Sequence, residues 1–287
     1  MSQLRIIGVD EAGFCFGVRR ALQLAREATE SHREVACLGP LIHNRQVVED
    51  LEQRGMRVVD DISDVSPGAA ALVRAHGAGP SVYEDAEERG VELIDATCPF
   101  VRRVQQAAAR FVEDDYQVIV LGERDHPEAQ AIVAHAGGRA VTVEDATELD
   151  QIEIADRVAV VCQTTQRMDK LQDLIRPLLP LISELRVANT ICDATSKRQK
   201  ASVHVAERAD LMIVVGGYHS ANTNRLAQIC RATGTRTEHI ETAEELDAGW
   251  LDGVQVVGIT AGASTPPEAT DAVCLRIEQL ASERSNS

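Results

Sequence analysis

Short apolar runs alternate with amphipathic segments along the whole chain. The apolar runs predict strands at 5–9, 34–38, 57–60, 70–74, 91–94, 117–121, 140–143, 157–162, 185–187, 211–215, 236–240 and 255–259. The segments between most of them predict helices, among them 18–30, 45–54, 80–89, 101–114, 166–179, 196–208, 222–233 and 267–280. Strands that alternate with helices pair in parallel, so we predict an α/β protein with mostly parallel sheets.

The residue composition agrees with that fold class. Aromatic residues make up only 3% of the 287 residues, so the core must be built from Val, Ile, Leu and Ala. These side chains are typical of parallel sheets that helices cover on both faces. The length is sufficient for two or three small domains or for one large domain.

The loops that follow the predicted strands repeat in three sets. The first set is "GPLIHN", "RAHGAG" and "DATC", and the second is "GERDHPE", "CQTT" and "NTIC". The third set is "GGYHSAN" and "TAGAST" near the C-terminus, together with "DEAGFC" after the first strand. We therefore predict three similar α/β domains, at 14–97, 98–190 and 191–287, with residues 1–13 completing the third. Because ligands bind beyond the carboxyl ends of parallel strands, we expect the loops to form one central site.

Three of the seven cysteines lie between a predicted strand and a predicted helix. Cys15 and Cys98 begin the similar stretches "CFGVRR" and "CPFVRR", and Cys192 precedes another helix. A helix N-terminus lowers the pKa of a thiol, and the thiolate is the form that binds metals. Three such thiolates can hold either zinc or an iron–sulfur cluster, and their spacing does not choose between the two. The remaining cysteines lie in apolar contexts that predict a packing role: Cys37, Cys162, Cys230 and Cys274.

Histidines and a carboxylate lie in the same post-strand loops. His43, His76 and His126 are suited to binding an anion or to transferring protons. Glu128, in the stretch "DHPE", could cap a helix that begins at the proline or could pass protons to a substrate. Thr164, in "CQTT", adds a hydroxyl to this group of side chains.

Two glycine-rich turns near the C-terminus each end in a helix start. Ser220 and Asn222 lie in the first turn, and Ser264 lies in the second. These residue types are ordinary helix N-caps, but together they could also cradle a diphosphate. Neither turn matches a P-loop or the G-x-G-x-x-G pattern, so the sequence gives no support for ATP or NAD binding.

The overall charge and hydropathy exclude other classes. A net charge of −16 argues against general nucleic-acid binding, which needs a basic face. The sequence has no apolar run long enough to span a membrane, and its first residues lack the regions of a signal peptide. We therefore expect a cytoplasmic protein with reduced cysteines.

Taken together, the motifs resemble those of the LytB (IspH) family of 4-hydroxy-3-methylbut-2-enyl diphosphate reductases. The matching stretches follow the family's order from residue 5 to about 280: "GFCFGVRRA", "GPLIHNRQVV", "AHG", "DATCP", "HPE", "QTT", "TICDATSKRQ", "SANTNRL" and "TAGAS". The resemblance implies a trefoil of three α/β domains around a central iron–sulfur site. It further implies that Cys15, Cys98 and Cys192 hold a [4Fe-4S] cluster.

The same resemblance implies roles for the polar residues. Residues expected to bind the diphosphate are His43, His76, Ser220, Asn222 and Ser264. His126 matches a further histidine of the substrate pocket, and Glu128 with Thr164 matches the pair that delivers protons at the substrate. Several positions depart from the family pattern. After "HPE" the family often has Val and then Gly two residues on, where this chain has Ala129 and Ala131. Ala221 removes one hydroxyl donor, and Phe16 puts a large ring beside the first cysteine.

The implied reaction is the removal of an allylic hydroxyl as water, with two electrons and two protons. It yields isopentenyl and dimethylallyl diphosphates in the last step of the methylerythritol phosphate route, with ferredoxin or flavodoxin as the electron donor. The alternatives are a paralogue that reduces another allylic diphosphate, a cluster-binding sensor without turnover and, more weakly, a zinc-dependent hydrolase. The intact set of Glu128, Thr164 and phosphate-loop residues argues against the sensor, because a sensor needs no proton donor.

Overall fold

A computed structural model of the chain describes residues 4–285, and it contains every predicted strand to within two residues at each end. The strands are β1 (Arg5–Gly8), β2 (Val35–Leu38), β3 (Met56–Val59), β4 (Ala70–Val73), β5 (Glu92–Asp95), β6 (Gln117–Leu121), β7 (Ala140–Val143), β8 (Arg157–Cys162), β9 (Glu184–Val187), β10 (Leu211–Val215), β11 (Arg236–Ile240) and β12 (Val256–Ala261). The apolar runs were sufficient to locate them because central parallel strands are buried on both faces.

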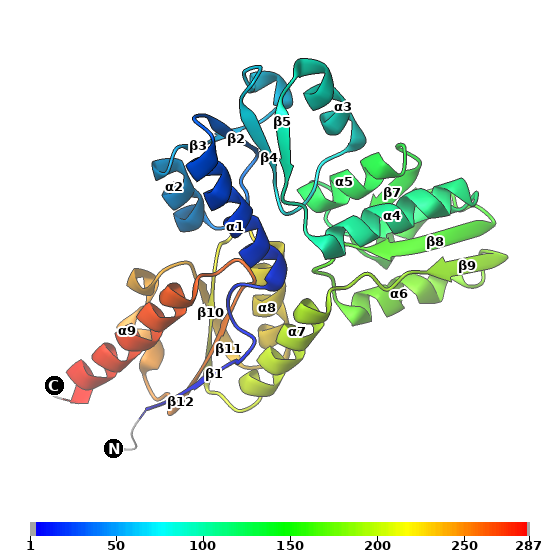
Figure 1. The fold of residues 1–287 in the computed structure, drawn as a ribbon. Helices are drawn as coiled ribbons and strands as arrows, with labels where there is room; N and C mark the ends of the chain where they lie inside the picture. The colour runs from blue at the N-terminus through cyan, green and yellow to red at the C-terminus, as the bar shows by residue number, and fades with distance from the viewer. Residues whose placement is uncertain (1–3, 286–287) are drawn as a thin grey trace. The chain divides into compact units, whose positions relative to one another are not determined.

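The α-helices lie between these strands, as Figure 1 shows. They are α1 (Phe16–Ser31), α2 (Arg45–Gln53), α3 (Pro80–Arg89), α4 (Pro99–Glu113), α5 (Pro127–His135), α6 (Met168–Leu178), α7 (Asp193–Ala206), α8 (Ala221–Ala232) and α9 (Pro267–Ser285). The predicted ranges included all of them except α5, whose nine residues are too short for a clear helical period. None of the helices among the described residues is long and apolar enough to cross a membrane.

The strands form three four-stranded parallel sheets with the same internal order. We call the sheet β3-β2-β4-β5 sheet B, the sheet β7-β6-β8-β9 sheet C and the sheet β11-β10-β12-β1 sheet A. In sheet A, β1 pairs with β12 from Arg5↔Val256 to Gly8↔Ile259. It thereby takes the edge position that β5 and β9 occupy in the other two sheets. The N-terminal strand therefore lies in the same sheet as the three C-terminal strands.

Helices cover both faces of sheets A and C. In sheet A, Leu211 and Ile259 pack with Ile277 of α9 in one cluster. On the other face of that sheet, Val214 packs with Leu226 of α8. Clusters of the same kind flank sheet C, with α6 on one face and α4 and α5 on the other. In each sheet, the loops that follow the strands lie at one edge, because parallel strands all end at that edge.

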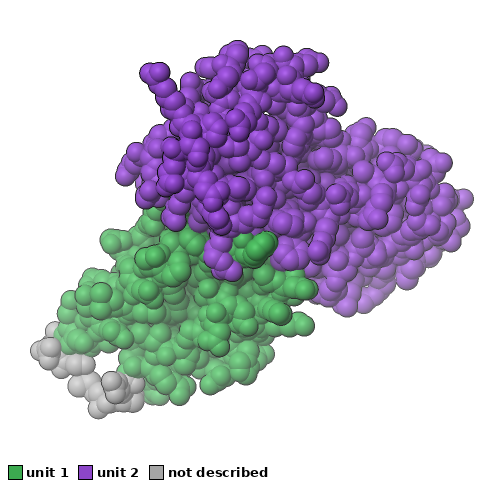
Figure 2. Space-filling view, in the orientation of Figure 1, with its two compact units in different colours: residues 1–16, 43–47, 193–287 green, residues 17–42, 48–192 purple. Residues whose placement is uncertain are grey.

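The described chain divides into two compact units, shown in different colours in Figure 2. Unit 1 comprises residues 1–16, 43–47 and 193–287, of which 4–285 are described, and it contains sheet A. Unit 2 comprises residues 17–42 and 48–192 and contains sheets B and C. Each of the three predicted domains contains the strands of one sheet, but their boundaries at 14–97, 98–190 and 191–287 with 1–13 stay a prediction.

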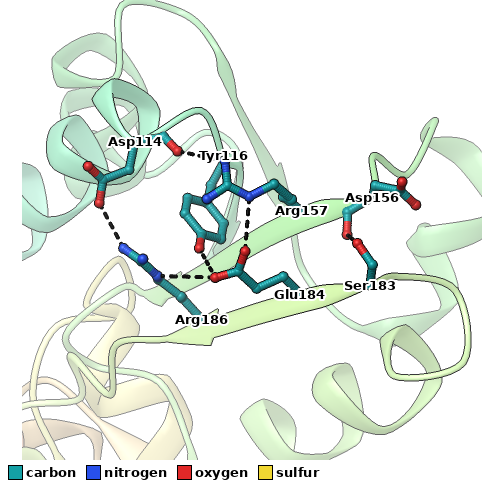
Figure 3. A network of polar contacts seen from close by, with 7 residues as sticks. All are labelled: Asp114, Tyr116, Asp156, Arg157, Ser183, Glu184 and Arg186. Carbon is teal, nitrogen blue, oxygen red and sulfur yellow. Dashed lines mark hydrogen bonds and ion pairs between the residues drawn. The ribbon is translucent and has the colours of Figure 1, made fainter.

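A polar network closes the amino end of sheet C in unit 2 (Figure 3). The ring of Tyr116 is buried, and the guanidinium carbons of Arg157 and Arg186 lie 4.2 and 4.5 Å from its centroid. The Tyr116 hydroxyl donates to Glu184, which also pairs with Arg157 at 3.0 Å. Cation–π contacts of this kind hold the starts of β8 and β9 against β6, at the end of the sheet away from the candidate site.

Candidate active site in the loops that follow the strands

The three cysteines that were predicted as metal ligands occupy equivalent positions. Each one directly precedes a helix: α1, α4 or α7. Each backbone N–H donates to a carbonyl that lies two residues past the end of the neighbouring strand. The bonds are Cys15 to Ala263 at 3.1 Å, Cys98 to Ala75 at 3.0 Å and Cys192 to Thr164 at 2.9 Å. The shared bond fixes each thiol at a helix N-terminus, as the sequence predicted.

Burial separates these cysteines from the rest. Cys15, Cys98 and Cys192 are partly exposed, and none of them forms a disulfide with a described residue. The other four were predicted as packing residues. Burial raises the pKa of the thiols of Cys37, Cys162 and Cys230 to about 12. Burial also raises the pKa of Cys274. Thiols of that kind stay protonated, so they are poor metal ligands.

The loops that lead to Cys98 and Cys192 contain the same kind of turn. Asp95 Oδ1 accepts the N–H of Thr97 at 2.8 Å, and Asn189 Oδ1 accepts the N–H of Ile191 at 3.3 Å. In both loops the Asp or Asn lies three residues before the cysteine. This is the hydrogen bond of an Asx turn, which explains why short polar side chains stand at these positions.

Glu128 and Thr164 are joined in unit 2, although 36 residues separate them in the sequence. Glu128 Oε1 accepts the N–H of Thr164 at 2.5 Å, and Oε2 accepts the Thr164 hydroxyl at 2.9 Å. Glu128 is only 2% exposed. Because the Thr164 carbonyl accepts the N–H of Cys192, the carboxyl group lies two hydrogen bonds from a cysteine. Glu128 therefore does more than cap α5, which was the alternative interpretation of its position.

The cap of α5 is His126, whose Nδ1 accepts the N–H of Glu128 at 3.1 Å. An accepting Nδ1 carries no proton, so this hydrogen bond assigns a neutral ring with its proton on Nε2. The ring of His126 meets the ring of His76 edge-on, with the centroids 5.1 Å apart. The structure thus brings two of the three predicted histidines together in unit 2.

In unit 1, the predicted anion-binding residues gather around the start of α8. Ser220 caps the helix by accepting the N–H of Thr223 at 3.4 Å, which leaves its own O–H available as a donor. Asn222 is 4% exposed, and neither polar atom of its amide is bonded to a described residue. Ser264 donates to the His43 carbonyl at 3.2 Å. A buried amide without a partner is costly, so it indicates a place for a ligand.

Sequence reasoning missed the glycines that make room for this group. A Cβ at Gly262 would lie 2.1 Å from Thr223 Oγ1, and a Cβ at Gly216 would lie 2.4 Å from Thr265 Oγ1. Both glycines directly follow strands of sheet A, so the two turns approach each other over buried threonines. The paired glycines of "GGYHSAN" and the glycine of "TAGAST" were the available signal, because only glycine permits such an approach.

The positions that depart from the family pattern differ in burial, since Ala129 and Ala131 are buried in α5. Phe16 is 56% exposed, so its ring faces solvent at the start of α1. Ala221 is buried as the first residue of α8, between Ser220 and Asn222.

The structure so far defines a class of α/β protein with three repeated parallel sheets. Each sheet is followed by a cysteine at a helix N-terminus, and sheet A also has donors for an anion at the start of α8. The family model described as LytB protein matches residues 6–278. The chain belongs to the LytB protein family.

Similar proteins cover nearly the whole chain. A protein of Geobacter sulfurreducens, named 4-hydroxy-3-methylbut-2-enyl diphosphate reductase, is 46% identical over 96% of this chain and 98% of its own length. The solved structure of E-1-hydroxy-2-methyl-but-2-enyl-4-diphosphate reductase from Plasmodium falciparum superimposes with a TM-score of 0.90 at 27% identity, over 94% of this chain and 86% of that one. A second solved structure, named as (E)-4-hydroxy-3-methyl-but-2-enyl diphosphate reductase, the terminal enzyme of the non-mevalonate pathway, gives a TM-score of 0.70 at 37% identity over 97% of this chain and all of that one.

Proposed function

We propose that this chain is a reductase that removes the allylic hydroxyl of 4-hydroxy-3-methylbut-2-enyl diphosphate. Two electrons and two protons cleave the C–O bond, and the products are water and either isopentenyl or dimethylallyl diphosphate. The observation that carries the proposal is the hydrogen-bonded chain from Glu128 through Thr164 to Cys192. It supports the proposal because two hydrogen bonds join a carboxyl group that can hold a proton to the backbone of Cys192, whose thiol we propose as a ligand of a redox metal centre.

We propose that Cys15, Cys98 and Cys192 together hold a [4Fe-4S] cluster. The donor set fits such a group, because soft thiolates at helix N-termini are the ligands that iron–sulfur clusters take. All three thiols are partly exposed, whereas the remaining cysteines are protonated by burial or lie on the outer helix α9. When bound, the cluster would supply the electrons and an iron without a protein thiolate, which acts as a Lewis acid toward the hydroxyl oxygen.

The diphosphate is held by the side chains at the start of α8 and by the histidines. The buried amide of Asn222 and the free O–H of Ser220 can each donate to a phosphate oxygen, and the N-terminus of α8 favours negative charge. We assign His43, His76 and Ser264 to the same anion. His126 contributes a neutral Nε2–H donor to the substrate pocket. Anchoring the anion orients the allylic alcohol, which turns binding energy into correct positioning.

Protonation of the departing oxygen is assigned to Glu128. Both of its carboxyl oxygens are oriented by Thr164, one by the backbone N–H and the other by the hydroxyl. A protonated Glu128 would donate to the leaving oxygen, and the Thr164 hydroxyl keeps the carboxyl group in place as its charge changes. Thr164 therefore has a part both in substrate binding and in proton delivery.

The electron donor and the location stay predictions. We propose ferredoxin or flavodoxin as the donor, because each can deliver the two electrons one at a time. A cytoplasmic location is the expectation drawn from the sequence, and reduced cysteines would follow from it.

The test is an anaerobic assay of the full chain with a chemically reduced dye and 4-hydroxy-3-methylbut-2-enyl diphosphate. Formation of the two five-carbon diphosphates supports the proposal, and failure with this substrate but turnover of another allylic diphosphate would identify a paralogue. A Cys98→Ser variant that retains an intact cluster would remove Cys98 as a ligand. A colourless protein that contains one zinc ion and no sulfide would indicate the zinc-dependent hydrolase. An intact cluster without turnover of any allylic diphosphate would indicate the sensor.

A further inference from the structure

A cavity in unit 2 lies at the carboxyl edge of sheet B. Its volume is about 310 Å³, and it is lined by residues that end or follow three strands of the sheet, together with parts of α3 and α5. Strands β2 and β4 are neighbours in the sheet, but the chain continues from β2 to β3 on one side and from β4 to β5 on the other. In open parallel sheets, ligands bind at such a reversal of strand order.

The cavity contains an arginine without a partner. Arg74 directly follows β4 and is mostly buried, and its side chain forms no hydrogen bond or ion pair with any residue in the range 4–285. Its guanidinium lies against Gly39, the first residue after β2, where a Cβ would come within 2.5 Å of it. An arginine stays charged at neutral pH, so a largely buried guanidinium needs a compensating charge.

The equivalent position in sheet C has an uncharged residue, whose amide oxygen has a hydrogen-bond partner. Gln163 directly follows β8 and packs against Gly122, as Arg74 packs against Gly39. Its amide oxygen accepts the N–H of Glu123 at 3.0 Å. All three repeats have a glycine after the first of these two strands, but the residue after the second strand is Arg74 in sheet B, Gln163 in sheet C and Gly262 in sheet A. The charge of Arg74 is an addition specific to sheet B.

Other groups on the cavity wall are suited to an anion. Helix α3 begins there with Gly79, which has no side-chain cap, and with Pro80, which has no N–H to satisfy. Ser81 adds a hydroxyl from the first turn, and Gln130 of α5 adds an amide. An uncapped helix N-terminus and an arginine together favour an oxyanion.

The remaining wall limits what can bind. Leu38, Val73 and Val82 present apolar surface. Asp60 and Asp61 lie at the exposed side, where Asp61 already accepts the N–H of Ser63 at 2.8 Å. Two carboxylates at the opening disfavour highly charged ligands. The cavity therefore suits a compact molecule with one anionic group.

We propose that this cavity binds a small organic anion, with a phosphate or carboxylate group on Arg74 and its body against the apolar wall. The cavity is separate from the candidate active site, since His76, His126 and Glu128 do not line it. It touches Gly77 and Pro127, the residues that directly follow His76 and precede Glu128. An occupant is therefore placed to affect both of these active-site loops.

Hydrogen–deuterium exchange on the anaerobically purified full chain tests the proposal. Inorganic phosphate and succinate are the two probes, each titrated at constant ionic strength. We expect at least one of them to slow exchange in the segment 77–82 in a saturable manner, and the probe that does so distinguishes phosphate from carboxylate. Protection of the segment 220–223 reports the proposed substrate site separately, so failure at one site leaves the other measurable.

Variants locate the anion. Arg74→Gln should raise the midpoint of protection at 77–82 at least tenfold and leave 220–223 unchanged. Arg26→Gln, which makes the same charge change at an exposed position of α1, should have no effect at either segment. Ser81→Ala serves as a second variant if Arg74→Gln does not fold. No protection at 77–82 by either probe in the native chain would overturn the proposal, as would protection that both cavity variants retain in full.

Discussion

Cysteines of this protein differ in exposure and in thiol pKa according to where the fold places them. Three cysteines are partly exposed at helix starts, whereas Cys37, Cys162 and Cys230 are buried and their pKa values are raised to about 12. Because only the thiolate reacts with alkylating agents, burial should control labelling.

In cluster-free protein at pH 8, we expect iodoacetamide to modify Cys15, Cys98 and Cys192 and to spare the three buried cysteines while the fold is intact. Peptide mass spectrometry over a time course measures this. Denatured protein is the control, in which the difference should vanish. Equal labelling rates in the native state would contradict the assignment.

The Glu128–Thr164 pair predicts a kinetic effect. Glu128→Gln keeps an oxygen that can accept the Thr164 N–H, but an amide cannot deliver a proton. We expect the cluster to be retained and turnover to fall by about 10² or more. The exposed Glu113→Gln provides a matched control with near-native rates. An anaerobic dye assay gives kcat, and near-native turnover of Glu128→Gln would remove its role as the acid.

Ala221 predicts an effect on affinity. It is buried between Ser220 and Asn222 at the start of α8, where a serine would add a hydroxyl donor. Ala221→Ser should strengthen diphosphate binding by about 1 kcal/mol, which is about fivefold in the inhibition constant of pyrophosphate. An unchanged constant would show that the missing hydroxyl has no effect on binding.

At the scale of elements, the turn between β5 and α4 depends on one carboxylate. Asp95 accepts the Thr97 N–H at 2.8 Å and the Tyr83 hydroxyl at 3.1 Å, and it pairs with Arg102 of α4. Burial raises the pKa of Asp95, but hydrogen bonds from Thr97 and the charge of Arg102 outweigh burial and hold the pKa below its usual value. The ionised form is therefore favoured by folding, and it positions the residues that lead to Cys98.

A lowered pKa gives this stabilisation a defined pH range. It is fully present above the unfolded-state pKa of about 3.9 and is lost as the pH falls through the lower folded-state value. Asp95→Asn should therefore lower the urea midpoint at pH 7, and its difference from the native chain should shrink toward pH 3. The exposed Asp150→Asn is the control. A difference that does not depend on pH would contradict the argument.

Element positions were largely predictable, but helix starts were less so. The helices α4 and α7 begin directly after their cysteines, whereas the apolar period predicted starts at 101 and 196. Helix α4 begins with Pro99, and the first turn of α7 contains Asp193 and Thr195, so hydrophobic spacing did not locate either start. Hydrophobic spacing also gave no range for the short helix α5, although the proline of "DHPE" indicated a helix that begins at Pro127.

At the scale of the whole molecule, the N-terminal strand is required to complete unit 1. Strand β1 forms the edge of sheet A, and Ile6 packs on one face while Ile7 and Val9 pack on the other. Removal of residues 1–9 should destabilise this sheet by about 3 kcal/mol or more, since several apolar side chains lose their burial.

Hydrogen exchange can test the consequence for each unit. In the truncated chain, we expect β12 to lose its protection, while β6 and β8 of unit 2 keep theirs. A peptide of residues 1–13 added in trans should restore part of the protection of β12. Unchanged exchange in β12 after truncation would show that β1 contributes little to sheet A.

The sequence by itself determined the parallel α/β class, the threefold repeat and the position of each candidate cysteine before a helix. These features depend on periodicity and on residues that are neighbours in the chain, so they are local. Only the tertiary structure decided that Glu128 bonds to Thr164, that His126 is held as a neutral donor beside His76, and that Arg74 lies unpaired against Gly39. Each of those facts depends on which side chains different strands bring to one sheet edge, and their distances and bonds exist only once the sheets have formed.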